Sequence, residues 1–94
     1  MSDIGLLAAQ IRAARGLLNW SQGYLASGCR LARSTLADLE SARRAPHEAT
    51  IYIIMSELTA AGVEFDKLGV SLRSYPPPDY VPTGLRGSKE VTAR

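Results

Sequence analysis

The sequence has little of the chemistry that builds disulfides, metal sites or membrane anchors. Its 94 residues include one cysteine and one histidine. A lone cysteine cannot form a disulfide framework within the chain, which favours a reducing, cytoplasmic setting. No cysteine pair or carboxylate cluster stands at ligand spacing around the histidine, so we expect no metal site. No apolar run approaches the roughly 20 residues of a membrane span, and the first residues lack the features of a secretory signal.

Catalytic motifs are missing as well. Serine, histidine and aspartate all occur, but nothing orders them as a nucleophile, a base and an orienting group. There is no glycine-rich phosphate-binding loop, so we expect neither an enzyme nor a bound cofactor. The net charge is only +2, from 11 basic and 9 acidic side chains. This balance is compatible with nucleic-acid binding but does not indicate it, so the argument depends on where the arginines lie.

What the sequence does have is apolar residues at helical spacing over its first two-thirds. The predicted helices cover residues 4–18, 21–27, 32–41 and 48–61. Pro46 prevents the third helix from continuing, and Gly62 is a candidate C-cap for the fourth. A chain of this length forms one domain at most, so residues 1–62 are predicted to be a single helical domain.

The pattern changes after residue 62. Residues 63–65 and 70–72 alternate apolar and polar side chains, which predicts a short hairpin or two extended segments within 63–75. Prolines and glycines interrupt all periodicity in residues 76–94, which we expect to be a disordered tail.

The predicted hairpin has two possible roles. Val70, Leu72 and Tyr75 are expected to be exposed, so that residues 63–73 could form a dimer surface by pairing of edge strands. The hairpin could equally pack on the fourth helix of its own chain, because a two-stranded ribbon is marginal alone. The sequence does not decide between them.

Residues 20–40 predict two short helices joined by a tight turn. Ser21 is a candidate N-cap, and Trp20 and Leu25 stand at the positions of a hydrophobic staple. Gly28 lies where the chain must bend and can supply unusual backbone angles. Two short helices that cross through such a turn form the helix-turn-helix motif, which presents its second helix to the major groove of DNA.

The motifs that surround this unit carry a family resemblance. They are Ile11-Arg-x-Ala-Arg15, Trp20-Ser-Gln22, Leu25-Ala26, Arg33-Ser-Thr35, Leu39-Glu40, Arg43-Arg44-x-Pro46 and Ala61-Gly-Val-Glu-Phe65. In this order and spacing, residues 7–65 resemble the Cro/repressor-type helix-turn-helix proteins, often called the xenobiotic-response-element family. The resemblance implies an all-α, compact, lambda-repressor-like domain of four to five helices, with a short extended or β segment after the last helix.

Three positions depart from the family pattern. Arg30 and Ala42 stand where the family usually has glycine, and Ala32 replaces its usual serine or threonine N-cap. Each change is expected to reduce local stability by up to about 1 kcal/mol.

The third predicted helix would present four residues to a DNA groove. A rotation of about 100° per residue turns Ser34, Ala37 and Asp38 away from the apolar face, with Arg33 at its edge. Arginine can pair with both acceptors of guanine, and serine can bond several base edges. Alanine can touch a thymine methyl group, and aspartate can accept from a cytosine amine, although its charge opposes the phosphates.

Four further residues are candidate DNA contacts. The resemblance implies that Gln22 contacts a phosphate or a base edge, and a helix N-terminus favours a phosphate oxygen. Arg43 and Arg44 follow the third helix and would position the duplex through its phosphates, with Thr35 contributing its hydroxyl.

Two residues of the motif have structural interpretations. Glu40 is expected to form a hydrogen bond or an ion pair with Arg12, Arg15 or Arg43. Cys29 is expected to pack as a small residue, since a redox-sensing thiol needs an accessible, electropositive site.

The sequence therefore predicts a sequence-specific DNA-binding regulator, most simply a repressor. One short helix contacts few base pairs, so a homodimer on a pseudo-palindromic operator of double-stranded DNA is expected. The alternative is a protein-binding module that kept the fold, either an antagonist of another regulator or an antitoxin. In that alternative, the tail segment 75–80 would bind a protein partner.

Overall fold

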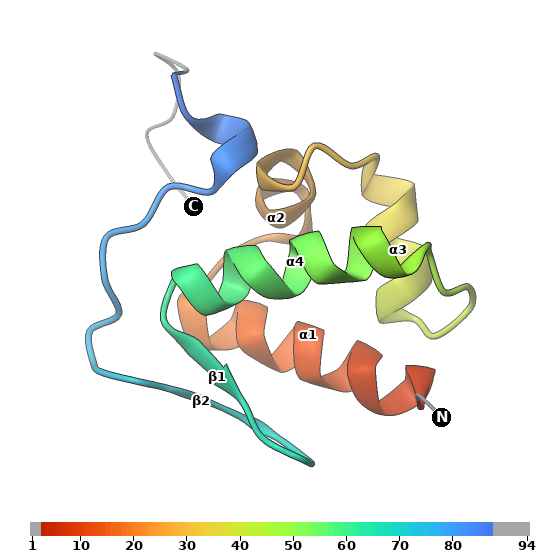
Figure 1. Cartoon of the computed structure of the whole chain (residues 1–94), viewed down its shortest axis with the longest axis horizontal. Helices are drawn as coiled ribbons and strands as arrows, with labels where there is room; N and C mark the ends of the chain where they lie inside the picture. Colours follow the sequence, from red (N-terminus) through yellow and green to blue (C-terminus); the bar gives the residue numbers. More distant parts are fainter. Residues whose placement is uncertain (1–2, 88–94) are drawn as a thin grey trace.

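The computed structural model describes residues 3–87, and four helices and a hairpin make up most of them (Figure 1). The helices are α1 (Ile4–Leu18), α2 (Gln22–Gly28), α3 (Arg33–Glu40) and α4 (Glu48–Ala60). The strands β1 (Val63–Phe65) and β2 (Val70–Leu72) pair antiparallel, with Glu64 opposite Ser71. A single 3₁₀ turn, η1 (Thr83–Leu85), follows. The predicted all-α fold with a short β segment is confirmed.

The helix starts follow the chemistry of their capping residues. The Asp3 carboxylate accepts hydrogen bonds from the backbone N–H groups of Gly5 and Leu6, at 2.9 and 3.3 Å. Ser21 Oγ accepts from the N–H of Tyr24 at 3.0 Å, so the predicted N-cap of α2 is confirmed. Ala32 occupies the N-cap position of α3 and provides no side-chain hydrogen bond.

The left-handed residues in the turns after α2 and α3 are not glycines, and Gly28 does not supply the bend as expected. Gly28 is the last residue of α2, and the left-handed residue of the turn is Arg30, with φ of 57°. Ala42 is left-handed as well, with φ of 60°, just after α3. Both family glycine positions are thus occupied by residues with a Cβ, while Gly28 has another role, in packing.

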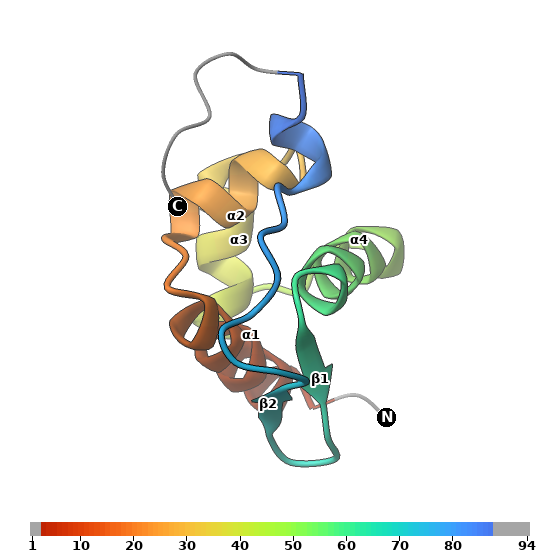
Figure 2. The same cartoon turned by 90° about the vertical axis from the view of Figure 1, so that its left-hand side faces the viewer.

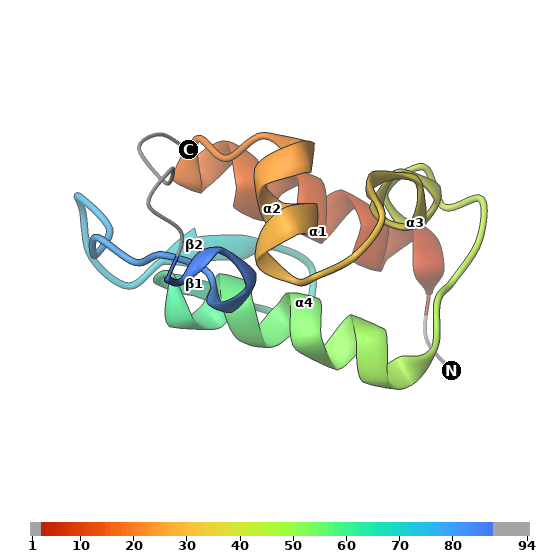
Figure 3. The ribbon, with the colours of Figure 1, turned by 90° about the horizontal axis from the view of Figure 1, so that it is seen from above.

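The core lies where the four helices and β1 meet. Its largest fully buried apolar side chains in the helical part come from every helix: Ile11, Leu25, Leu36, Leu39, Ile54 and Leu58. Helices α1 and α4 run alongside each other and begin on the same side of the molecule, and α2 and α3 lie across them (Figures 1 and 3). Within residues 3–87, none of the helices combines the length and apolarity that crossing a bilayer requires.

The hairpin packs against its own chain. Val63 is fully buried, and Val70 and Leu72 are half-buried against the helical core. Gln10 of α1 donates from Nε2 to the carbonyl oxygens of Asp66 and Gly69, at 2.8 and 3.0 Å. Val70 and Leu72 are therefore not the exposed dimer residues that the sequence suggested, although Tyr75 is 85% exposed.

The expected disordered tail needs a correction for residues 76–87. This segment climbs from the hairpin along the side of the molecule and ends beside α2 (Figures 1 and 2). Pro82 is fully buried, and the phenol of Tyr80 donates to the Glu57 carboxylate of α4 at 2.7 Å. The remainder of the predicted tail, 88–94, lies outside the described residues.

Candidate nucleic-acid interface

A buried ion pair between Arg15 and Glu40 lies beneath the candidate interface and supports it. Arg15 of α1 donates from Nε and Nη2 to the two carboxylate oxygens of Glu40, each at 2.7 Å. Glu40 is 3% exposed, and Arg12 adds a hydrogen bond to its backbone carbonyl. The hydrogen bond to Glu40 raises the pKa of Arg15 against the opposing effect of burial, so the guanidinium stays charged. The expected pairing of Glu40 is confirmed, and it ties the end of α3 to α1.

The same carboxylate holds the first residue of α2. Gln22 Nε2 donates to Glu40 Oε1 at 3.2 Å, and Gln22 Oε1 accepts from Arg33 Nε at 3.5 Å. A polar chain therefore runs from the buried ion pair out to an exposed arginine. It brings together two predicted site residues from different helices, Gln22 and Arg33.

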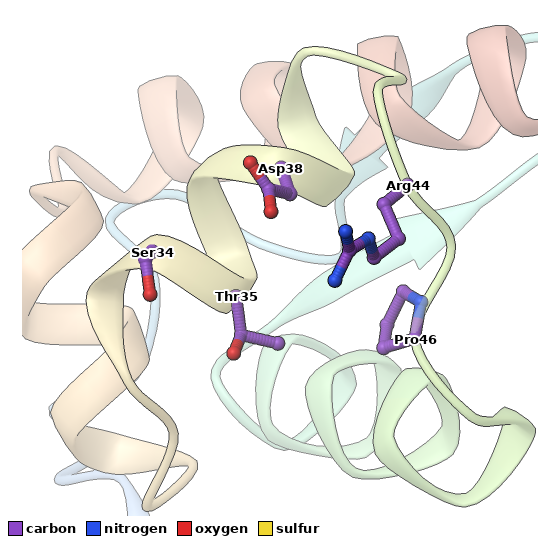
Figure 4. Close-up of a pocket in the computed structure, with 5 residues that line it drawn as sticks. All are labelled: Ser34, Thr35, Asp38, Arg44 and Pro46. Carbon is purple, nitrogen blue, oxygen red and sulfur yellow. The ribbon is translucent and has the colours of Figure 1, made fainter.

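A second group of predicted residues lines a shallow pocket of about 160 Å³ on the outer side of α3. Ser34, Thr35 and Asp38 project from the helix, and Arg44 and Pro46 approach from the loop that follows (Figure 4). The lining has a hydroxyl donor, a carboxylate acceptor and a guanidinium donor within one concave surface. These are the groups that read base edges and bind phosphates.

Asp38 also organises the loop after α3. Its carbonyl oxygen accepts from the N–H groups of Arg43 and Arg44, at 2.9 and 3.3 Å. Its carboxylate lies 3.6 Å from Arg43 Nη1, and the Arg43 side chain is 77% exposed. The negative charge on the outer face of α3 is therefore partly neutralised by an adjacent arginine.

The remaining predicted residue, Ala37, is half-buried on α3 beside Asp38. The fully buried Leu36 and Leu39 face the core, so the predicted division of α3 into inner and outer faces is confirmed. Sequence reasoning missed Pro46 as a pocket residue and missed the bond between Gln22 and Glu40. The only sequence signal for the second is that Gln22 and Glu40 each belong to one of the motifs that carry the family resemblance, which does not show that they touch.

Cys29 has no place in this interface. It is buried behind the turn, and burial together with the negative charge of Glu57 raises the pKa of its thiol to about 12. A neutral, inaccessible thiol is a packing group and not a redox sensor. No group of histidine, cysteine and carboxylate side chains suited to a metal ion occurs among residues 3–87.

Comparison with known proteins adds one match. A family model described as Helix-turn-helix matches residues 11–59, just over half of the chain. Neither the curated proteins nor the solved structures include a match to the chain. The matched segment begins at Ile11 and covers α2, α3 and the loop that carries Arg43 and Arg44. The chain therefore belongs to the helix-turn-helix family and carries a DNA-binding domain of the kind found in regulators.

Proposed function

We propose that the protein is a sequence-specific transcriptional repressor that binds a pseudo-palindromic operator as a homodimer, in the manner of the xenobiotic-response-element group. The observation that carries this proposal is the arrangement around α3. Arg33, Ser34 and Asp38 lie on its outer side, and the exposed Arg43 and Arg44 flank it. In this proposal α3 reads base edges, while Gln22, Thr35 and the two flanking arginines fix the duplex through its phosphates.

The homodimer is proposed because α3 is short. Its eight residues span about 12 Å, which is far less than one turn of DNA. Two copies on half-sites about one helical turn apart would double the contacts. Operators whose half-sites are about 10 or about 15 base pairs apart test this directly, because the second spacing turns one half-site to the opposite side of the duplex. Equal affinity for both spacings would contradict the dimer.

Two arginine substitutions test the readout. Arg33→Ala is expected to relax the sequence preference at one base pair at a cost of about 1–3 kcal/mol in binding free energy. Arg43→Ala is expected to weaken binding to all sequences alike and to lower the salt slope by about one unit. Lys67→Ala removes the same charge from the exposed hairpin turn and should change neither property. The measurement is a mobility-shift titration at several salt concentrations, starting from the DNA that flanks the gene. Salt-independent binding, or none to any duplex, would overturn the proposal.

The alternative function, a protein-binding module without a DNA role, has less support. Its partner segment was 75–80, and Tyr80 is engaged with Glu57 of the chain's own α4. Tyr75 is the exposed aromatic side chain of that segment. A partner that bound through Tyr80 would first have to break the bond to Glu57.

A further inference from the structure

The segment of residues 80–86, here called the clasp, packs so closely against the C-terminal end of α2 that a Cβ on Gly28 or Gly84 would not fit. A Cβ on Gly28 would lie 2.3 Å from the Pro82 Cβ, and a Cβ on Gly84 would lie 2.2 Å from the Ser27 carbonyl oxygen. Real Cβ atoms do not approach other atoms so closely. Two glycines on opposite sides of one contact, with a fully buried proline between them, indicate that the clasp and α2 are closely packed and complementary in shape.

Glu57 of α4 fastens the clasp. Its Oε1 accepts from the Tyr80 phenol at 2.7 Å and from the Thr83 backbone N–H at 3.0 Å, and the residue is 8% exposed. Arg86 lies over the Tyr80 ring, 5.1 Å from its centroid, and its Nε donates to the Val81 carbonyl at 3.0 Å. A buried carboxylate needs such donors, because a charge left without partners in the interior is strongly unfavourable.

The clasp lies behind the candidate interface and not over it. In the views of Figures 1 and 3, α2 separates η1 from α3. The clasp therefore leaves the outer side of α3 open. It touches the end of α2 opposite to Gln22, the residue that is bonded to Glu40 and Arg33.

Helix α2 depends on such external support. Seven residues are too few for a helix that is stable on its own, so its position is set by what it packs against. One end is fixed by the bond from Gln22 to Glu40, and the other by the clasp and by the turn, where the Leu31 N–H donates to the Ala26 carbonyl at 2.9 Å. The turn leads directly into Arg33, so a shift of α2 moves residues on both helices of the motif.

We propose that the clasp is a positioning device for DNA binding, with Glu57 as its fastening residue, so that whatever opens the clasp lowers the affinity of the helix-turn-helix for DNA. This inference rests on the proposed function. It makes the C-terminal segment a regulatory element of the domain: a protein that captured Tyr80 would release α2 and reduce DNA binding without touching α3.

The sign of the effect on affinity distinguishes this role from simple electrostatics. Glu57→Ala removes a negative charge, which by itself would strengthen binding to DNA. The clasp predicts weaker binding, by about fivefold or more. Glu64→Ala is the matched control, because it removes the same charge from an exposed position on β1 and leaves the clasp intact. It should bind DNA as tightly as the unmodified chain or slightly more tightly.

A second variant opens the clasp without a change of charge. Gly84→Ala forces a Cβ against the Ser27 carbonyl and should weaken DNA binding in the same way as Glu57→Ala. Gly16→Ala is its control, because a Cβ on Gly16 in α1 would have open space. The duplex for all titrations is one selected in vitro with the unmodified chain.

Hydrogen exchange reports on the clasp independently of DNA. In both clasp variants the amides of Cys29 and Leu31 should exchange about tenfold faster or more, while those of Ile11 and Ala14 in α1 keep their rates. Faster exchange at Cys29 and Leu31 with unchanged DNA affinity would overturn the proposal, as would equal acceleration in α1, which indicates general destabilisation. Failure of the unmodified chain to select any duplex would overturn the proposed function and this role in DNA binding together. The exchange rates would still decide whether the clasp fixes α2.

Discussion

At the scale of single residues, Arg30 and Ala42 are sites of stored strain, because each has a left-handed backbone at a position where the family usually has glycine. Arg30 and Ala42 are exposed and have φ of 57° and 60°. In the left-handed region, a residue with a Cβ has a conformational free energy about 1 kcal/mol less favourable than that of glycine. Arg30→Gly and Ala42→Gly are each expected to stabilise the chain by about that amount, which chemical denaturation measures as a higher midpoint at unchanged slope.

The opposite substitution provides the comparison for that prediction. Gly62, with φ of 116°, is already glycine, and a Cβ there would lie 3.0 Å from the Pro78 Cδ. Gly62→Ala should therefore destabilise the chain. If Ala42→Gly and Gly62→Ala changed stability in the same direction, backbone strain would not be the cause.

The two ion pairs of the candidate interface should differ greatly in their effect on stability. Removing the Glu40 carboxylate with Glu40→Ala leaves Arg15 and Gln22 without their acceptor and is expected to destabilise the chain by about 3 kcal/mol. Asp38→Ala breaks a pair whose side chains are 77% and 30% exposed, and should change stability by less than about 1 kcal/mol. Thermal unfolding of the two variants distinguishes them, and equal losses would contradict the assigned roles.

At the scale of secondary-structure elements, the N-termini of α2 and α3 can be compared directly, because Ser21 caps α2 with its side chain and Ala32 cannot cap α3. Ala32 has the extended backbone of an N-cap, with φ of −64° and ψ of 141°, but no side chain that can accept a hydrogen bond. Ala32→Ser is expected to stabilise the chain by about 1 kcal/mol, and Ser21→Ala to destabilise it by a similar amount. Denaturation midpoints measure both. No gain from Ala32→Ser would mean that the first turn of α3 is capped adequately by solvent.

The helices could be predicted from the sequence because their signals are local. Apolar spacing, together with capping at Ser21, placed α2 within one residue of its observed bounds, Gln22–Gly28. Which residues of α3 face outward also follows from periodicity alone. The bond between Gln22 and Glu40 could not be predicted in this way, because it depends on how two helices cross and how far their side chains reach.

At the scale of the whole molecule, the clasp makes stability depend on pH. Burial alone would raise the pKa of Glu57, but the hydrogen bonds from Thr83 and Tyr80 and the charge of Arg86 outweigh it and lower the pKa. A carboxyl group with a lowered pKa in the folded state contributes stability above its ordinary pKa of about 4.3, and the contribution is lost as the pH falls through the lowered value.

The pH dependence gives a direct test. Glu57→Gln should be less stable than the unmodified chain at pH 7, and the difference should shrink toward zero as the pH falls below about 4. Thermal unfolding of both proteins across this pH range measures it. A difference that persists unchanged into acid would show that packing, and not the charge of the carboxylate, fastens the clasp.

The clasp is also where sequence interpretation failed, and the reason is physical. Prolines and glycines that break periodicity are typical of disordered chains. In residues 76–87 they instead fit a surface: Pro82 fills the space that Gly28 leaves, and Gly84 lets the backbone approach Ser27. Amino-acid composition indicates only that a segment lacks regular local structure. It does not show whether residues distant in the chain form a surface on which that segment packs.

The close contact between Gly28 and Gly84 determines when, during its synthesis, a new chain can bind DNA tightly. The ribosome adds residues from the N-terminus, so α2 is complete well before the segment that packs behind it exists. Until translation has passed Arg86 and the segment has left the exit tunnel, the end of α2 is uncovered and Glu57 has no donors. On the proposal made above, a nascent chain therefore stays weak in DNA binding until the clasp has left the exit tunnel and packed against α2.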